Sequence, residues 1–421
     1  MGWRGILALT TVMVLFTVSG CGDSKGAPIW TMMVYMAGDN NLSIAALRDL
    51  AEMEVIGSTA QVNVVAQIDT LGGNARRVFV QEGDSTLMED LGERNMADAA
   101  ALTEFILWAK AKFPAHRYAL ILWDHGDGLA KALPTRNPPM RKILQDDTDN
   151  VPCCLSNRIV RQAIEDAGLH FNLLGFDASQ MGQIETAYEF RDLADILLFS
   201  QETGQENGWD YTAILSALAD KPLMPDEELS TVIVDSYRAF YEGTTYPPYL
   251  TISAIRLGED IHDLAMRIDT LAGLLIEGLT ADHQLLLAAI GTVREETQEM
   301  NPLTIPDVYV DLMDLVENLQ GQLEAETDPS PLVREIIEET GAILAMKDEI
   351  ILSEYHGEAR PGANGISIVF FRLPEVFNTP QTSNTYKIYF PDSADENQIL
   401  FIKETRWDDF LQTYYQAAGL I

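Results

Sequence analysis

Apolar runs of strand length alternate with helical patterns through the first half of this chain. The apolar runs lie at 30–36, 62–68, 118–123, 171–176 and 196–199. Strands that alternate with helices favour βαβ units, because a crossover helix returns the chain to a neighbouring parallel strand. We therefore expect an α/β fold with a largely parallel sheet.

The remaining elements follow from the same spacing rules. A short strand is expected at 77–80, and Asp98 is the predicted N-cap of a helix that ends near Lys112. From about residue 222 helical patterns dominate, and this part of the chain either forms a second domain or completes the first sheet. Its helices are predicted at 226–241, 261–277, 282–299, 308–319, 331–345 and 407–417, and its strands at 249–255, 366–371 and 386–390.

Three neighbouring strands of this pattern end in polar residues. The run at 118–123 is followed by Asp-His-Gly-Asp-Gly at 124–128, the run at 171–176 by Asp-Ala-Ser at 177–179, and the run at 196–199 by Ser-Gln-Glu-Thr at 200–203. Open α/β sheets bind ligands at the carboxyl ends of their strands. The sequence therefore predicts a site where these three segments meet.

The residue types at these strand ends suit acyl transfer. His125 can act as a base, and Gly126 lets the backbone approach a bound group and present an N–H to an oxyanion. Ser179 is the hydroxyl at the tip of the adjacent strand, and Asp177 is either a helix cap or a charge for a basic side chain. A lone histidine after a strand is also often structural, so both interpretations remain at this point.

Several segments resemble, in the same order, those of the clostripain family of cysteine peptidases. Residues 30–42 look like the family's opening strand and turn, 123–128 are similar to its His-Gly motif, and 175–182 to its nucleophile motif. Residues 200–203 with 208–211 resemble the segment that follows. Weaker similarities at 251–255, 365–368 and 407–411 extend the resemblance to about residue 415.

The resemblance implies a caspase-like αβα sandwich with a mostly parallel central sheet, and an endopeptidase that cleaves after Arg or Lys. In the family's pattern His125 is the general base and Gly126 contributes an oxyanion-hole N–H. Ser179 stands where the family has its catalytic cysteine. The implied partners are peptides or proteins with exposed Arg or Lys side chains.

The same resemblance implies an acidic pocket for the basic side chain. Asp177 lies in that pocket, with Glu202 and Asp210 as further acidic groups near it. The family also undergoes self-cleavage in the loop between the His and nucleophile strands. Here the loop at 129–152 contains peptide bonds after Arg or Lys that could be self-cleaved. The basic residues are Lys131, Arg136, Arg141 and Lys142. Charged residues in a long loop are also often simply solvated.

The serine at position 179 puts the family's activity in doubt. A thiol is partly ionised at neutral pH, whereas a hydroxyl needs a base placed to remove its proton during attack. Neither Cys153 nor Cys154 lies at a strand end with the nucleophile motif. Three explanations remain: an inactive binding protein, a true serine-dependent hydrolase, and a chain whose cysteine was replaced to trap a zymogen or substrate.

The N-terminus has the layout of an export signal. Residues 1–20 carry one positive charge at Arg4, then an apolar run too short to span a bilayer comfortably. The following Val-Ser-Gly-Cys resembles the bacterial lipobox, which implies lipidation of Cys21 and anchoring at the bacterial cell envelope. The alternative is ordinary cleavage and release of the protein.

The chain then divides into a signal peptide (1–20), a lipidated Cys with its tether (21–28), a peptidase-like core (29–221) and a helix-rich C-terminal region (222–421).

Charge limits the partners of this chain. With 28 Lys and Arg against 64 Asp and Glu, the formal net charge is −36, and such a surface repels phosphate backbones. Nucleic acid is therefore excluded as a partner. Basic peptides and divalent cations are attracted to such a surface, unless the charge serves solubility alone.

The segment 146–150 (Asp-Asp-Thr-Asp-Asn) offers oxygen ligands for a hard cation, although it lacks the Gly and the terminal Glu of an EF-hand loop. Calcium, which the resemblance also implies, is the cofactor that the sequence suggests.

A second His-Gly pair lies at His356-Gly357. It is expected in a Gly- and Pro-rich loop with no apolar strand before it. We therefore predict a structural role for this histidine.

Overall fold

The computed structural model describes residues 26–126, 128–129, 144–146, 154–281, 284–301, 308–373, 375, 380–391 and 398–421. The predicted signal segment, Cys21, Asp127, Cys153 and the basic residues of the loop lie outside these residues. No helix in the described ranges is long and apolar enough to cross a membrane.

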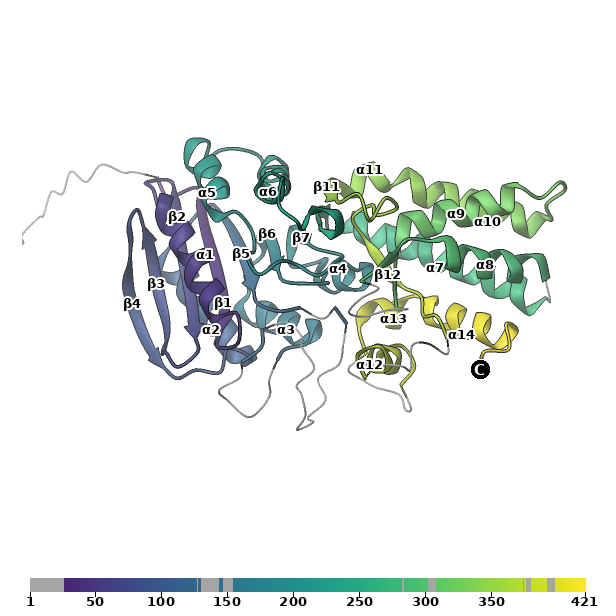
Figure 1. Ribbon diagram of the computed structural model, residues 1–421, viewed down its shortest axis with the longest axis horizontal. Helices are drawn as coiled ribbons and strands as arrows, with labels where there is room; N and C mark the ends of the chain where they lie inside the picture. Colours follow the sequence, from purple (N-terminus) through teal and green to yellow (C-terminus); the bar gives the residue numbers. More distant parts are fainter. Residues whose placement is uncertain are drawn as a thin grey trace, which may run out of the picture.

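A sheet of nine strands forms the centre of the part that the structure describes (Figure 1), in the order β11-β8-β7-β6-β5-β1-β2-β3-β4. Its middle five strands are mutually parallel: β1 (Trp30–Gly38), β2 (Val62–Thr70), β5 (Arg117–Trp123), β6 (Phe171–Asp177) and β7 (Ala194–Phe199). The outer strands pair antiparallel: β3 (Ala75–Gln81), β4 (Asp84–Gly92), β8 (Thr251–Arg256) and β11 (Ile351–His356). The five parallel strands are those that the apolar runs predict, because a parallel strand covered on both faces is apolar along its length.

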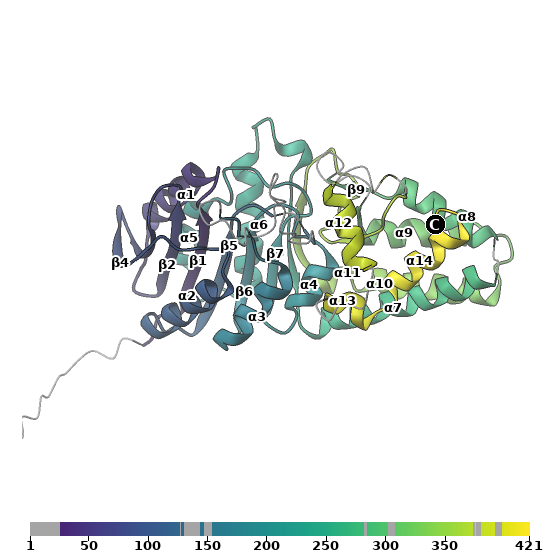
Figure 2. The ribbon, with the colours of Figure 1, turned by 90° about the horizontal axis from the view of Figure 1, so that it is seen from below.

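Helices cover both faces of this sheet and make a three-layered αβα sandwich (Figure 2). The first face is covered by α1 (Ser43–Ile56), α5 (Tyr211–Asp220) and α6 (Asp226–Tyr241). The second is covered by α2 (Ala99–Lys112), α3 (Asn157–Ala167) and α4 (Ile184–Phe190). Asp98 caps α2 as predicted, since its side chain accepts a hydrogen bond from the N–H of Ala100.

The C-terminal part completes the central sheet and adds a group of helices beside it. Its strands β8 and β11 extend the central sheet, while its long helices lie together beyond that end of the sheet (Figure 1). These helices are α7 (Glu259–Thr280), α8 (Gln284–Glu296), α9 (Leu312–Glu324), α10 (Pro331–Ala345) and α14 (Trp407–Ala417). A small antiparallel sheet joins β9 (Glu299–Met300), β10 (Tyr309–Asp311) and β12 (Ser367–Val369), and the short helices are η1 (Pro247–Tyr249), α11 (Lys347–Ile350), α12 (Pro380–Tyr389) and α13 (Leu400–Glu404).

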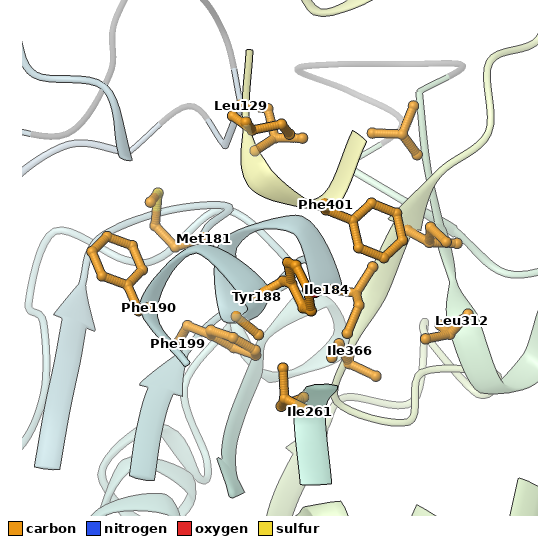
Figure 3. Packing of buried hydrophobic residues seen from close by; sticks show 14 of the residues in the cluster. Leu129, Met181, Ile184, Tyr188, Phe190, Phe199, Ile261, Leu312, Ile366 and Phe401 are labelled. Atoms are coloured by element: carbon orange, nitrogen blue, oxygen red, sulfur yellow. The ribbon is translucent and has the colours of Figure 1, made fainter. Parts of the chain in front are cut away.

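The two parts share one apolar core. In Figure 3 the α4 residue Tyr188 lies among Ile261 of α7, Ile366 and Phe401 of α13, and all four belong to one buried cluster. This cluster therefore runs from the sandwich into the C-terminal helices.

Two predicted elements are corrected. Residues 386–390 were expected to form a strand but belong largely to α12, where Tyr386, Tyr389 and Phe390 surround Phe371. Their spacing of three and four residues is helical. His356 ends strand β11 and does not sit in a loop; its Nδ1 lies 2.9 Å from Glu354 Oε2, which fits the predicted structural role.

Strand β4 was missed by the sequence reading. Most of its side chains are exposed or half-buried, since it forms the outer edge of the sheet. An edge strand of this kind lacks the apolar run from which the other strands were predicted.

Candidate active site

The ends of β5, β6 and β7 form one pocket of about 200 Å³. Trp123 at the end of β5 pairs with Asp177 at the end of β6, so the residues that follow these strands lie side by side. His125, Asp177, Ser179 and Gly204 all line the pocket. The shared edge of parallel strands thus brings together the histidine, the serine and the acid that the sequence singled out.

Gly126 and Gly204 place the backbone directly against Ser179. A Cβ on Gly126 would lie 2.1 Å from the carbonyl oxygen of Ser179, so only glycine fits there. The N–H of Gly204 donates a hydrogen bond of 3.0 Å to Ser179 Oγ. The hydroxyl is therefore held at the mouth of a pocket whose walls come from two neighbouring loops.

His125 is held by an amide. Its Nε2 lies 2.8 Å from Oδ1 of Asn41, in the turn between β1 and α1. That turn is fixed by Asn40, whose side-chain N–H groups reach Asp124 Oδ1 at 2.8 Å and the Gln145 carbonyl at 3.0 Å. When Nε2–H donates to Asn41, Nδ1 is the nitrogen that can accept a proton.

Sequence reasoning did not assign a role to Asn41. The residue belongs to the opening segment that carries the family resemblance, but no spacing rule connects it with His125, which lies 84 positions further along. Its role follows from the parallel pairing of β1 with β5, which brings the ends of the two strands together.

Asp177 is half-buried and accepts two hydrogen bonds. Its Oδ2 accepts from the N–H of Trp209 at 3.1 Å and from the hydroxyl of Tyr211 at 2.9 Å. Burial raises the pKa of Asp177 to about 7, and these two bonds lower the pKa only in part. A positively charged ligand side chain beside this carboxylate would favour its ionised form.

A fully buried carboxylate, that of Asp49 of α1, lies close to Asp177. A Cβ on Gly208 would lie 2.8 Å from Oδ2 of both residues, so both carboxylates face the same glycine. Asp49 accepts a 2.7 Å hydrogen bond from Trp123 Nε1, and burial together with the charge of Asp177 raises its pKa to about 9. Sequence reasoning missed Asp49, although its spacing from the buried Ala45, Ala46 and Met53 places it on the apolar face of the helix.

The other two predicted acids do not line the pocket, and that expectation is corrected. Glu202 is buried and its carboxylate pairs with Arg360, while it also accepts the N–H of Asn301 at 2.9 Å. Asp210 caps α5 by accepting the N–H of Ala213 at 2.8 Å. Glu206, which the sequence analysis did not single out, does line the pocket. Both predicted acids follow β7 in sequence, but the carboxylate of Glu202 is bound by residues distant in sequence and that of Asp210 by the first turn of α5.

One acidic cluster with the spacing of metal ligands lies outside this pocket. It joins Asp39, Glu93 and Asp146 within the described part of the chain. Of the segment 146–150 predicted as a cation ligand, Asp146 is described and the other four residues lie outside the described ranges.

Comparison with known proteins places these features in a family. The model of the clostripain family matches residues 34–414, which include the loops of His125 and Ser179. Clostripain from Hathewaya histolytica is 26% identical over 224 residues, and the match covers 45% of this chain and 42% of that protein.

Two solved structures share the fold. A secreted cysteine protease from Bacteroides thetaiotaomicron, solved with an irreversible peptide inhibitor, is 20% identical with a TM-score of 0.62, over 93% of this chain and 99% of that one. The inactive zymogen of a protease from Parabacteroides distasonis is 20% identical with a TM-score of 0.63, over 90% and 99% of the two chains. Since the family model spans most of the sequence and the fold agrees, this chain belongs to the clostripain family.

Proposed function

We propose that this protein binds peptides through an exposed Arg or Lys side chain and hydrolyses them slowly, with Ser179 in place of the family's cysteine. The observation that carries this proposal is that Asp177, His125 and Ser179 line one pocket. A half-buried carboxylate next to a nucleophile position suits recognition of a cation at the residue being cleaved. The surplus of acidic residues supports basic peptides as partners.

The reaction assigns one task to each of three groups. Ser179 Oγ attacks the carbonyl carbon of the bound peptide while its proton passes to Nδ1 of His125. The N–H of Gly126 is the proposed donor to the developing oxyanion. The protonated histidine then gives its proton to the leaving amine, and water releases the acyl group from Ser179 by the reverse proton path.

Two features support slow turnover. A serine hydroxyl is far less acidic than a thiol and depends on the base throughout the attack. Nε2 of His125 lies against the amide of Asn41, and an amide stabilises an imidazolium less than a carboxylate at the same place would. These same features favour the alternative function, a pseudopeptidase that binds basic peptides at the cell envelope without cutting them.

The test compares three forms of the full chain on a fluorogenic peptide with Arg at the cleaved position. Ser179→Cys is expected to raise kcat by on the order of 100-fold, while Ser179→Ala abolishes the residual rate. A peptide with Gln in place of Arg is the control for the charged pocket. If the unaltered chain and Ser179→Cys both bind the Arg peptide but only Ser179→Cys cuts it, the pseudopeptidase is the correct function. Failure of all three forms to bind the Arg peptide would overturn both.

We also propose that the chain is exported and lipid-anchored through Cys21. The signal-like segment at 1–20 and the lipobox-like residues before Cys21 support this, as does the description of the Bacteroides thetaiotaomicron relative as secreted. Labelled fatty acid should be incorporated by bacterial cells that express the full chain and not by those that express Cys21→Ala. Equal labelling of the two would contradict the anchor.

A further inference from the structure

A loop with two exposed tyrosines lies at the same edge of the sheet as the candidate site. Along this edge β5 ends before His125, β6 ends before Ser179, and β7 and β8 come next. Strand β8 runs antiparallel to β7, so the chain enters β8 at this edge. The loop 242–250, between α6 and β8, therefore lies beside the end of β7, and we call it the tyrosine loop. Thr251 confirms this position, because its Oγ1 accepts the N–H of Gln201 at 3.0 Å.

Tyr246 and Tyr249 are the only exposed aromatic side chains in the part of the chain that the structure describes. Their exposed fractions are 48% and 52%, whereas the other described Phe, Tyr and Trp side chains are buried or half-buried. An exposed aromatic ring offers a large and rigid apolar surface, and such rings are enriched where proteins bind partners. Because both lie in one loop beside the candidate site, the tyrosine loop is suited to binding.

Tyr249 is supported by a buried arginine. The guanidinium carbon of Arg360 lies 5.3 Å from the centre of the Tyr249 ring, and Arg360 is only 7% exposed. The backbone on both sides of the ring is also fixed. The carbonyls of Pro248 and Leu250 accept N–H groups from the segment 357–359, at 2.8 Å and 2.9 Å. A ring that is already held in place loses little conformational freedom when a ligand packs against it.

The proposed reaction determines the direction in which a peptide crosses this edge. His125 gives its proton to the leaving amine, so the part of the substrate after the cleaved bond lies toward β5. The part before the cleaved bond then extends the other way, over the ends of β7 and β8. Gly204 lies on that side, since it follows β7 and its N–H donates to Ser179 Oγ at 3.0 Å. The residues that precede the cleaved Arg or Lys are therefore the ones that reach the tyrosine loop.

Strand spacing determines which of these residues meets Tyr249. Neighbouring strands lie about 4.8 Å apart, so the two spacings from β6 to β8 make about 10 Å. An extended peptide covers about 3.3 Å per residue, so this distance corresponds to about three residues. Successive side chains of an extended peptide point to opposite sides, so the residues next to the third one are directed away from the ring.

We propose that Tyr249 is a specificity-determining residue whose ring binds an aromatic or large apolar side chain at the third residue before the cleaved Arg or Lys. The role of Tyr249 rests on the proposed binding of Arg and Lys peptides and adds a second point of recognition to it. Packing of an aromatic side chain against the ring removes apolar surface of both groups from water. Glycine at the same position of the peptide makes no such contact.

The test uses two fluorogenic peptides that differ only at this position, one with Phe and one with Gly three residues before the Arg. In the full chain with Ser179→Cys, the Phe peptide is expected to have a KM about tenfold below that of the Gly peptide, with a similar kcat. Tyr249→Ala should raise the KM of the Phe peptide to that of the Gly peptide and leave the Gly peptide unchanged. Tyr249→Phe keeps the ring and should preserve the difference between the peptides.

The matched control is Leu223→Ala, which removes a side chain of a residue that is 70% exposed at the opposite edge of the sheet. The carbonyl of the adjacent Pro222 accepts the indole N–H of Trp30, the residue that begins β1, which places Leu223 at that edge. This variant should keep the difference between the two peptides. An unchanged Tm shows that each variant is folded.

The outcomes separate the role of Tyr249 from the proposed function. Equal KM values for the two peptides, with both cleaved by Ser179→Cys, would overturn the role of Tyr249 and leave the proposed function standing. A higher KM for both peptides in Tyr249→Ala would show that the ring supports the loop and does not bind the substrate. A peptide with Phe at the second residue before the Arg should behave like the Gly peptide, and a lower KM would overturn the assigned position. Failure to bind either peptide would overturn the proposed function and the role of Tyr249 together.

Discussion

Asn41 Oδ1 lies 2.8 Å from Nε2 of His125 and orients the imidazole toward the pocket that Ser179 also lines. The amide fixes the ring without supplying a negative charge. The site thus combines an ordered histidine, a hydroxyl and a half-buried acid. This arrangement makes the role of each group measurable.

Asn41 is predicted to be a positioning residue. In the Ser179→Cys background, Asn41→Ala should lower kcat by about 10- to 100-fold with little change in KM, because the ring is no longer held. Asn41→Asp should restore kcat and move the acidic limb of the kcat profile to higher pH, since a carboxylate raises the pKa of histidine. Asn74→Ala, on an exposed turn, is the control. If Asn41→Ala lowers kcat and Asn41→Asp does not restore it, Asn41 is not a positioning residue for His125.

Binding of basic peptides should depend on the ionisation of Asp177. Because burial raises its pKa to about 7, affinity of an Arg peptide for Ser179→Ala should rise by about tenfold from pH 6 to pH 8. The direction follows from the charge, since the ionised carboxylate attracts the guanidinium. Fluorescence anisotropy measures the affinity. With Asp177→Asn added, the affinity for the Arg peptide should be low and should not change with pH. If this variant keeps the original pH dependence, another group is responsible for it.

Asp49 should make the protein less stable as pH rises. Its pKa is raised from 3.8 to about 9, so the folded state binds one more proton than the unfolded state between these values. This group is therefore expected to lower the free energy of unfolding by about 1.4 kcal/mol for each pH unit within that window. Urea unfolding at pH 6 and pH 8 should show that Asp49→Asn gains stability relative to the unaltered chain by about 3 kcal/mol over this interval. If the free energies of unfolding of the two proteins change equally with pH, this prediction is wrong.

Gly126 should tolerate no side chain. In Gly126→Ala the new Cβ would meet the Ser179 carbonyl oxygen at 2.1 Å, which forces the two loops apart. We expect a loss of about 1–3 kcal/mol in stability and loss of turnover in the Ser179→Cys background. Gly321→Ala on α9 is the control, since no atom lies within 4 Å of its Cβ. Normal turnover of Gly126→Ala would show that the contact is not needed.

Glu202 is predicted to act on stability and not on specificity. Its pair with Arg360 is buried, with side-chain exposures of 5% and 8%. Glu202→Gln leaves the guanidinium unpaired and should cost about 3–5 kcal/mol in unfolding by urea. KM for Arg peptides should not change in the Ser179→Cys background. A raised KM with unchanged stability would return Glu202 to the substrate pocket.

The sequence identified the parts of the site that lie where strands end. His125, Asp177 and Ser179 each follow an apolar run, and carboxyl ends of parallel neighbours always share one edge of a sheet. Predicting the strands was therefore enough to predict that these residues meet. The same argument failed for Glu202 and Asp210, because position after a strand does not determine which hydrogen-bond partner a carboxylate finds.

The sequence by itself determined the α/β class, the parallel core and the sheet edge at which the candidate site lies, because strand periodicity and order are local properties of the chain. Only the tertiary structure decided the partners of Asn41, the pairing of Asp49 with Asp177 and the meeting of Asp39 with Asp146. Each of these contacts joins residues of different elements that lie far apart in the sequence. Burial and proximity, which give these groups their chemistry, exist only after the sheet has formed.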